Sequence, residues 1–128
     1  MKIEIRNAAF HGDQSVLPAA AAECAAASNK FWPYHELLIA TIMSGQVQQL
    51  DKNVLKQIGD YLKLGTEFGQ CVDSGKNETK VKDETTQASD KDGVSVTPYF
   101  LVNGKVFKGA EPYSTFKTAI DEALAGNK

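Results

Sequence analysis

The chain has 128 residues, of which 42% are hydrophobic and 23% are charged, and its formal net charge at pH 7 is −2. This length and composition predict a single folded domain with a sizeable core rather than a disordered chain. The charge provides no basic surface for nucleic acid or for an anionic membrane, and the sequence has no run of about 18 apolar residues that would span a bilayer.

The N-terminus begins with an alternating pattern. Its first residues, M-K-I-E-I-R-N, place Ile3 and Ile5 between charged side chains, which predicts a short β-strand that starts almost at the first residue. They lack the apolar core of a signal peptide. Residues 7–17 are expected to form a loop in which Phe10 reaches the core. His11 is interpreted as a hydrogen-bonded structural residue, because no second ligand lies at metal spacing.

Five helical segments are predicted after this loop, and a sixth, amphipathic one near the C-terminus. The first begins at Pro18, which suits the first turn of a helix, and is rich in alanine. Asp51 is the expected N-cap of the third. His35 is interpreted as a core histidine in the second. The fifth is polar, and Gly93 is expected to end it in the left-handed conformation. The expected ranges are 18–27, 31–45, 52–62, 67–73, 76–92 and 112–126.

The clearest local signal is the stretch V-S-V-T-P-Y-F-L-V-N-G-K-V-F-K-G at residues 94–109. The pair Asn103-Gly104 supplies the two positive φ angles of a type I′ turn. It separates residues 99–102 from residues 105–108, and both of these have strand character. Pro98 lies at the entrance of the first strand, where it removes no central hydrogen bond. Considered alone, this position favours a trans peptide bond before Pro98, with the proline at the edge of a strand.

The only two cysteines, Cys24 and Cys71, lie far apart on two predicted helices. They exclude a CxxC motif and a four-thiolate zinc site within the chain. Two interpretations stay open: two buried thiols that act as small hydrophobic side chains, or one structural disulfide, which would contribute about 4 kcal/mol in the chain-entropy model. A catalytic dithiol does not fit, because redox-active thiols lie close together at a helix N-terminus.

Several stretches together point to one known family. They are the T-P-Y-F-L-V-N-G-K-V-F-K-G hairpin region, F-H at 10–11, A-E-C-A at 22–25, K-F-W-P-Y-H-E-L-L at 30–38, C-V-D-S-G-K at 71–76 and G-A-E-P-Y-S-T-F-K-T-A-I at 109–120. This set resembles the DsbA-like branch of the thioredoxin superfamily over nearly the whole chain. The resemblance implies an α/β, thioredoxin-like fold of DsbA type in one domain, residues 1–128. A helical insertion would occupy about 17–92 and a C-terminal ββα unit 96–126.

The resemblance also implies roles for individual residues. Thr97 and Pro98 would form the cis-proline loop that lies beside the active-site thiols in that family and that, with Val96, binds extended substrate peptide. Pro98 is then cis, in contrast to its local interpretation. Cys24 and Cys71 would form the structural disulfide that some members carry in the helical insertion. No metal and no cofactor is implied.

One departure from the family pattern affects the chemistry. The family's first strand, its catalytic CxxC motif and the following helix have no counterpart in residues 1–128, so no catalytic residue is assigned. They would precede Met1 as a unit of roughly 30 residues, the size of a βαβ element. The absent strand belongs between the strand at residues 3–6 and the strand at 99–102, whose edges would otherwise lie open.

Three explanations compete for this departure. In the first, Met1 is an internal methionine of a longer protein, or the chain has been cut from one. That longer parent protein is then an ordinary oxidoreductase. Alternatively, the gene is truncated, and a homodimer or strand exchange completes the sheet. In the third explanation the chain is a non-catalytic peptide-binding or chaperone-like module that retains the groove. The first is preferred, because the downstream strand and loop are complete.

The expected parent function is thiol–disulfide exchange on protein or peptide substrates that carry thiols or disulfides. That reaction needs a thiolate that attacks through a mixed disulfide, so this chain is expected to be redox-inactive alone, and whether it acts as an enzyme is left open. The expected compartment is extracytoplasmic, the periplasm or cell envelope, because an even pair of well-placed cysteines suits an oxidising environment.

Overall fold

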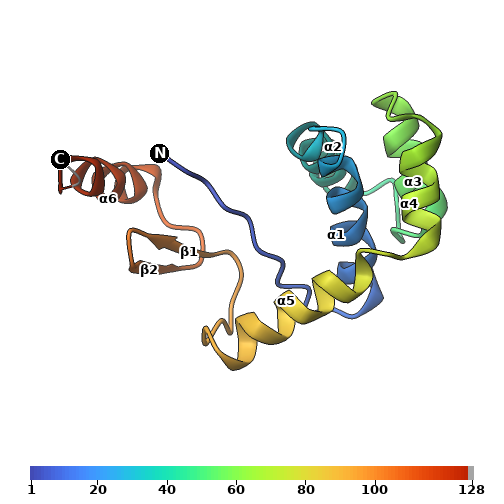
Figure 1. Cartoon of the computed structure of the whole chain (residues 1–128). Helices are drawn as coiled ribbons and strands as arrows, with labels where there is room; N and C mark the ends of the chain where they lie inside the picture. Colours follow the sequence, from blue (N-terminus) through green and yellow to red (C-terminus); the bar gives the residue numbers. More distant parts are fainter. Residues whose placement is uncertain (127–128) are drawn as a thin grey trace.

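The structure, a computed structural model, describes residues 1–126 of the chain. These residues form helices α1 (Asp13–Ala26), α2 (Phe31–Met43), α3 (Lys52–Tyr61), α4 (Gly65–Ser74) and α5 (Glu78–Asp90), strands β1 (Tyr99–Val102) and β2 (Lys105–Lys108), and helix α6 (Tyr113–Gly126). Helices α1–α4 are bundled at one end of the molecule, and α5 leads away from them to the hairpin and α6 at the other end (Figure 1). The N-terminal segment runs back from α1 towards α6.

The bundle is built around α1, whose buried residues are mostly alanines. These small side chains allow α2, α3, α4 and α5 to pack against a single helix. Tyr34 of α2 is fully buried against them. Its hydroxyl donates a hydrogen bond of 3.0 Å to the Leu55 carbonyl, and its ring centroid lies 5.2 Å from that of Phe68. One side chain therefore joins α2 to both α3 and α4.

The start of α1 differs from the sequence prediction. The helix begins at Asp13, so residues 13–17 are helical rather than part of a loop, and Pro18 lies inside the helix. Pro18 removes only one hydrogen bond near the helix start, where the acidic Asp13 also suits the positive end of the helix dipole. Phe10 precedes the helix and is 38% exposed, so the expectation that it reaches the core is wrong.

The expected strand at residues 3–6 is absent from the described structure. Residues 1–10 carry no assigned secondary structure, and the sheet consists of β1 and β2 alone. The alternating sequence pattern favours an extended strand, but a strand also needs a neighbouring strand with which its backbone N–H and C=O groups can form hydrogen bonds. No described segment provides that neighbour.

The Asp51 cap and the hairpin are confirmed, whereas α4 is longer than the expected 67–73 and α5 is shorter than the expected 76–92. Asp51 caps α3 by accepting a hydrogen bond of 2.9 Å from the Val54 amide. Gly75 ends α4 with a φ of 66°. Asn103 and Gly104 form the turn of the hairpin with φ angles of 50° and 86°. The residue types of the turn were therefore sufficient to predict where the hairpin lies.

The hairpin and α6 form a second, smaller packed unit. β1 and β2 pair antiparallel, with Phe100 opposite Phe107 and Leu101 opposite Val106. Phe116 of α6 packs on the first pair, with ring centroids 4.7 Å from Phe100 and 5.4 Å from Phe107. Leu101 and Val106 project from the opposite face and are exposed. Helix α6 therefore covers one face of the hairpin only.

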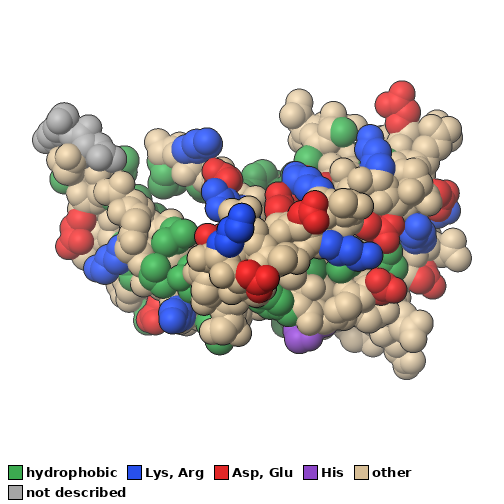
Figure 2. Space-filling model, turned by 60° about the horizontal axis from the view of Figure 1, so that its bottom comes forward, with side chains coloured by type: hydrophobic (Ala, Val, Ile, Leu, Met, Phe, Trp, Pro, Cys, Tyr) green, Lys and Arg blue, Asp and Glu red, His purple; other side chains and the backbone are tan. Residues whose placement is uncertain are grey.

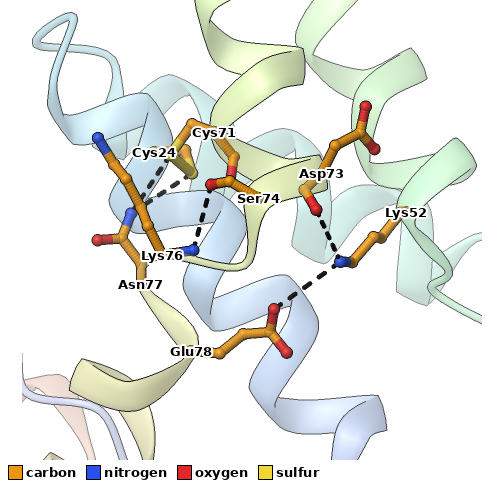
Figure 3. The surroundings of a disulfide bond; sticks show 8 residues. All are labelled: Cys24, Lys52, Cys71, Asp73, Ser74, Lys76, Asn77 and Glu78. Atoms are coloured by element: carbon orange, nitrogen blue, oxygen red, sulfur yellow. Dashed lines mark hydrogen bonds and ion pairs between the residues drawn. A yellow bond between two sulfur atoms is a disulfide. The ribbon is translucent and has the colours of Figure 1, made fainter.

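A disulfide between Cys24 of α1 and Cys71 of α4 fastens the bundle. Figure 3 shows the Asn77 side chain beside it, where the amide nitrogen lies 3.4 Å and 3.5 Å from the two sulfur atoms. Nearby, Lys52 of α3 donates a hydrogen bond to the Asp73 carbonyl at the end of α4. The end of α4 is thus tied to α1 and to α3, which fixes the direction in which the chain leaves for α5.

Replacement of both cysteines by alanine is expected to lower the free energy of unfolding by about 2–5 kcal/mol, because the unfolded chain regains the freedom that the cross-link removes. Urea unfolding with and without dithiothreitol measures the effect. The reductant should bring the wild-type midpoint down towards that of Cys24→Ala/Cys71→Ala and leave the double variant unchanged. A wild-type midpoint that does not respond to reduction contradicts the prediction, as do two reactive thiols in the denatured, unreduced protein.

Burial raises the pKa of the Tyr34 hydroxyl well above its usual value. In the unfolded chain this group ionises near pH 10, whereas in the folded protein it keeps its proton, so stability present below pH 10 is lost above it at about 1.4 kcal/mol per pH unit. Tyr34→Phe is expected to lose about 1 kcal/mol at neutral pH with its hydrogen bond, and to show a shallower alkaline decline. The exposed Tyr61 provides the control, because Tyr61→Phe should follow the wild type in urea unfolding at each pH. Parallel alkaline declines for Tyr34→Phe and wild type contradict the prediction.

Candidate substrate-binding loop

Residues 91–98 connect α5 to β1, and the last part of this connection, residues 94–98, is a loop that is fastened at its two ends. The Val94 amide donates a hydrogen bond of 2.8 Å to the Ala88 carbonyl, and the Pro98 carbonyl accepts one of 2.8 Å from the Gly109 amide. Between these anchors, residues 95–97 form no backbone hydrogen bond with any other described segment. The loop is therefore held in place while its middle keeps its backbone donors and acceptors free.

The three residues that the resemblance assigns to substrate binding lie together in this loop. Val96 is 45% exposed, Thr97 and Pro98 are also exposed, and the peptide bond between Thr97 and Pro98 is cis. The local interpretation of a trans edge proline is therefore wrong. The binding role of the three residues stays a prediction.

This arrangement suits recognition of an extended polypeptide. Free backbone N–H and C=O groups on a fixed, exposed segment pair with a second backbone in the manner of an added strand, whatever its sequence. The exposed Val96 side chain supplies an apolar contact beside those groups. The loop contains no charged side chain, so backbone pairing and apolar contact are the interactions that it offers.

A polar cluster at the start of the chain anchors the N-terminal segment to the helices. The Asn7 amide side chain donates to Glu84 of α5 at 2.7 Å and to Glu23 of α1 at 2.9 Å. Lys80 reaches Glu23 at 2.7 Å, and this hydrogen bond raises the pKa of the Lys80 ammonium. Sequence reasoning missed this cluster, because its members lie far apart in the chain and match no spacing rule.

A second contact links the N-terminal segment to the approach of the loop. Arg6 lies 3.9 Å from Asp92, which follows α5, and it also pairs with Glu4 at 2.9 Å. These pairs raise the pKa of Arg6 and lower that of Glu4, but the side chains are exposed and such pairs add little stability. Ile3 and Ile5 remain exposed beside them.

The cysteines do not contribute a free thiol to the loop. Cys24 and Cys71 are the only cysteines of the chain, and both belong to the disulfide within the helical bundle. The bundle and the loop lie in different parts of the molecule (Figure 1). The loop therefore has no thiol of this chain beside it.

The two histidines show no catalytic arrangement. His35 is half-buried and stacks on Phe31, with ring centroids 5.8 Å apart, beside Trp32. His11 is exposed, and its backbone amide donates to the Ser15 hydroxyl at 3.3 Å. Within residues 1–126, no group of three or more His, Cys, Asp or Glu side chains is placed to hold a metal ion. Nor does any helix of that range combine the length and apolar character needed to cross a membrane.

Comparisons with known proteins give one match. Neither the curated proteins nor the solved structures yield a match to the chain. The sequence model of the family described as thioredoxin matches residues 1–122, which include the bundle, the loop, the hairpin and most of α6. The mixed helical structure with its small antiparallel sheet is consistent with that assignment. The chain belongs to the thioredoxin family.

Proposed function

We propose that this chain is the substrate-binding part of a thiol–disulfide oxidoreductase of the DsbA type. The observation that carries the proposal is the exposed loop that contains residues 96–98. It is anchored through Val94 and Pro98 and leaves the backbone groups of residues 95–97 free. Membership of the thioredoxin family supports a function in disulfide chemistry. The motifs around residues 30–38 and 71–76, the helical insertion and the disulfide within it support the DsbA-like branch.

In the proposed reaction, a substrate thiolate attacks the disulfide of a CxxC pair, and one cysteine of that pair leaves as a thiolate. A second substrate thiolate then attacks the mixed disulfide, so that the substrate gains a disulfide and the CxxC pair ends as a dithiol. Residues 96–98 would hold the substrate backbone during both steps. The CxxC pair has to come from outside residues 1–128, because the cysteines of this chain form the bundle disulfide.

The proposed substrates are proteins or peptides with thiols or disulfides, and the proposed compartment is extracytoplasmic. The disulfide of the bundle supports an oxidising compartment, since such bonds persist there and are rare in the cytosol. No cofactor takes part, because cysteine sulfur atoms carry both electrons.

A second candidate function is peptide binding without redox chemistry, as in a chaperone-like module. It is favoured by one observation, that the exposed loop has no thiol of this chain beside it. The two candidates share the loop and differ in whether a dithiol completes it.

Peptide binding at the loop is tested with the isolated, extended insulin B chain. Val96→Lys is expected to weaken its binding about tenfold, because the charge replaces an apolar contact. Val106→Lys is the matched control, since Val106 is 43% exposed against 45% for Val96 but lies on β2. Chemical-shift titration of the 128-residue chain measures both. Equal weakening by the two changes would count against the loop as the binding site.

Insulin reduction then separates the two functions. The 128-residue chain is expected to show no turnover, and turnover would refute the claim that it lacks a catalytic dithiol. A version with a strand, a CxxC motif and a helix added before residue 1 should reduce insulin, with kcat/KM about tenfold lower in its Val96→Lys variant. If the added unit folds and no turnover appears, the peptide-binding function is favoured instead.

A further inference from the structure

Asn7 forms hydrogen bonds with two helices. Its side-chain amide donates one hydrogen bond of 2.9 Å to Glu23 of α1 and one of 2.7 Å to Glu84 of α5. Its backbone amide donates a third, of 3.1 Å, to the same oxygen of Glu84. Asn7 is itself half-buried. One residue of the N-terminal segment therefore bridges α1 and α5.

The residue type at position 7 matters because both of its partners are carboxylates. An asparagine side chain has two N–H groups and no charge, so it can donate one hydrogen bond to each carboxylate, and bonds to an ionised acceptor are stronger than neutral ones. Lys80 offsets part of the repulsion between the carboxylates, at 2.7 Å from Glu23 and 3.9 Å from Glu84. Figure 2 shows acidic and basic side chains close together over the middle of the molecule.

The apolar contact between α5 and α1 is small. The buried residues of α5 are Val81 and Ala88, and Val81 lies in a core cluster with Val16 and Ala20 of α1. This cluster is separate from the larger core of the bundle. The hydrogen bonds of Asn7 therefore contribute to fixing the angle at which α5 leaves α1.

The end of α5 determines in turn where the candidate loop begins. Ala88 lies one helical turn after Glu84, and its carbonyl accepts the 2.8 Å hydrogen bond from the Val94 amide. The Asp92 amide returns to the same turn through a bond of 3.1 Å to the Gln87 carbonyl. A change in the tilt of α5 would therefore move the start of the loop.

We infer that Asn7 is a positioning residue for the peptide-binding loop. It holds α5 on α1 through Glu84 and Glu23, and α5 then sets the place of residues 94–98 relative to the bundle. The inference rests on the proposed binding function of that loop. A loop that samples other positions is competent to bind for only part of the time, so its apparent affinity falls in proportion.

Asn7→Asp tests the inference, because it keeps the shape of the side chain and replaces both N–H donors by a third negative charge. The 128-residue chain with this change is expected to bind the isolated insulin B chain about five- to tenfold more weakly at neutral pH. Asn53→Asp is the matched control, since it makes the same change at an exposed position of α3 and should leave the affinity unchanged. Chemical-shift titration measures both.

The same spectra separate positioning from a general loss of stability. The amide shifts of residues 94–97 should move in Asn7→Asp before peptide is added, whereas the Leu55 amide in the bundle core keeps its wild-type shift. A purely structural role of Asn7 would lower the unfolding midpoint and leave both the loop shifts and the affinity of the folded chain unchanged. If Asn7→Asp does not fold, Asn7→Ala removes the two donors without adding a charge and takes its place.

Two further measurements test the hydrogen bonds themselves. A carboxyl at position 7 faces Glu23 and Glu84, with Lys80 beside them, so it should take up a proton above the usual range and become a donor again. The deficit of Asn7→Asp relative to wild type is therefore expected to shrink as the pH falls to about 5. In Asn7→Asp/Glu84→Gln the new amide can donate to position 7, and this double variant should bind at least about threefold more tightly than Asn7→Asp.

Wild-type affinity in Asn7→Asp, or weaker binding with unmoved shifts at residues 94–97, would overturn the inference. A deficit that persists at the lower pH and in the double variant would also overturn it, because the hydrogen bonds would then not be its cause. Failure of the proposed function has a different signature, which is equal weakening by Val96→Lys and Val106→Lys. Val96→Lys weakened alone, together with wild-type binding by Asn7→Asp, would reject the positioning role and leave the proposed function standing.

Discussion

Close packing around α1 is the constraint on which the helical half of the molecule depends. Its buried alanines, which include a fully buried Ala25, let four neighbouring helices approach one axis. Larger side chains on this face would push those helices apart, since protein interiors leave no space to absorb them. The small side chains make this arrangement of helices possible, but they do not specify it by themselves. The disulfide and the hydrogen bond of the buried Tyr34 hydroxyl then fix the positions of the helices.

The other half of the molecule lacks an equivalent centre. The hairpin packs one face on α6 through three phenylalanines and leaves its second face and its β1 edge open. The bundle therefore has a closed core of its own, whereas the hairpin unit leaves the apolar side chains of Leu101 and Val106 exposed.

The sequence predicted best those features that local chemistry determines. The Asn103-Gly104 turn and the Asp51 cap each depend on a few neighbouring residues, and the structure shows both. Gly93 has the expected left-handed conformation, with a φ of 68°, but α5 already ends at Asp90, so Gly93 does not end it. The prediction that α1 begins at Pro18 is wrong, because a proline within the second turn of a helix is unusual but tolerated. The strand at residues 3–6 failed for a different reason: alternation is local, but pairing needs a neighbour that the described chain does not contain.

The candidate loop was located through its family motif, whereas its anchors were not foreseen. Nothing near Asn7 in the sequence indicates Glu23 or Glu84, since a hydrogen-bond cluster between distant segments leaves no periodic signal. The same holds for the bond between the Gly109 amide and the Pro98 carbonyl, which follows only once the hairpin register is known.

The position of the loop has a mechanical consequence. The bundle and the hairpin unit have separate cores, and residues 91–98 form one of the few connections between them. Arg6 reaches across to Asp92 at this same junction. Residues 95–97 therefore lie in the stretch of chain that joins the two halves. A polypeptide bound along the loop would lie against this junction, so its binding would depend on how the two halves are placed relative to each other.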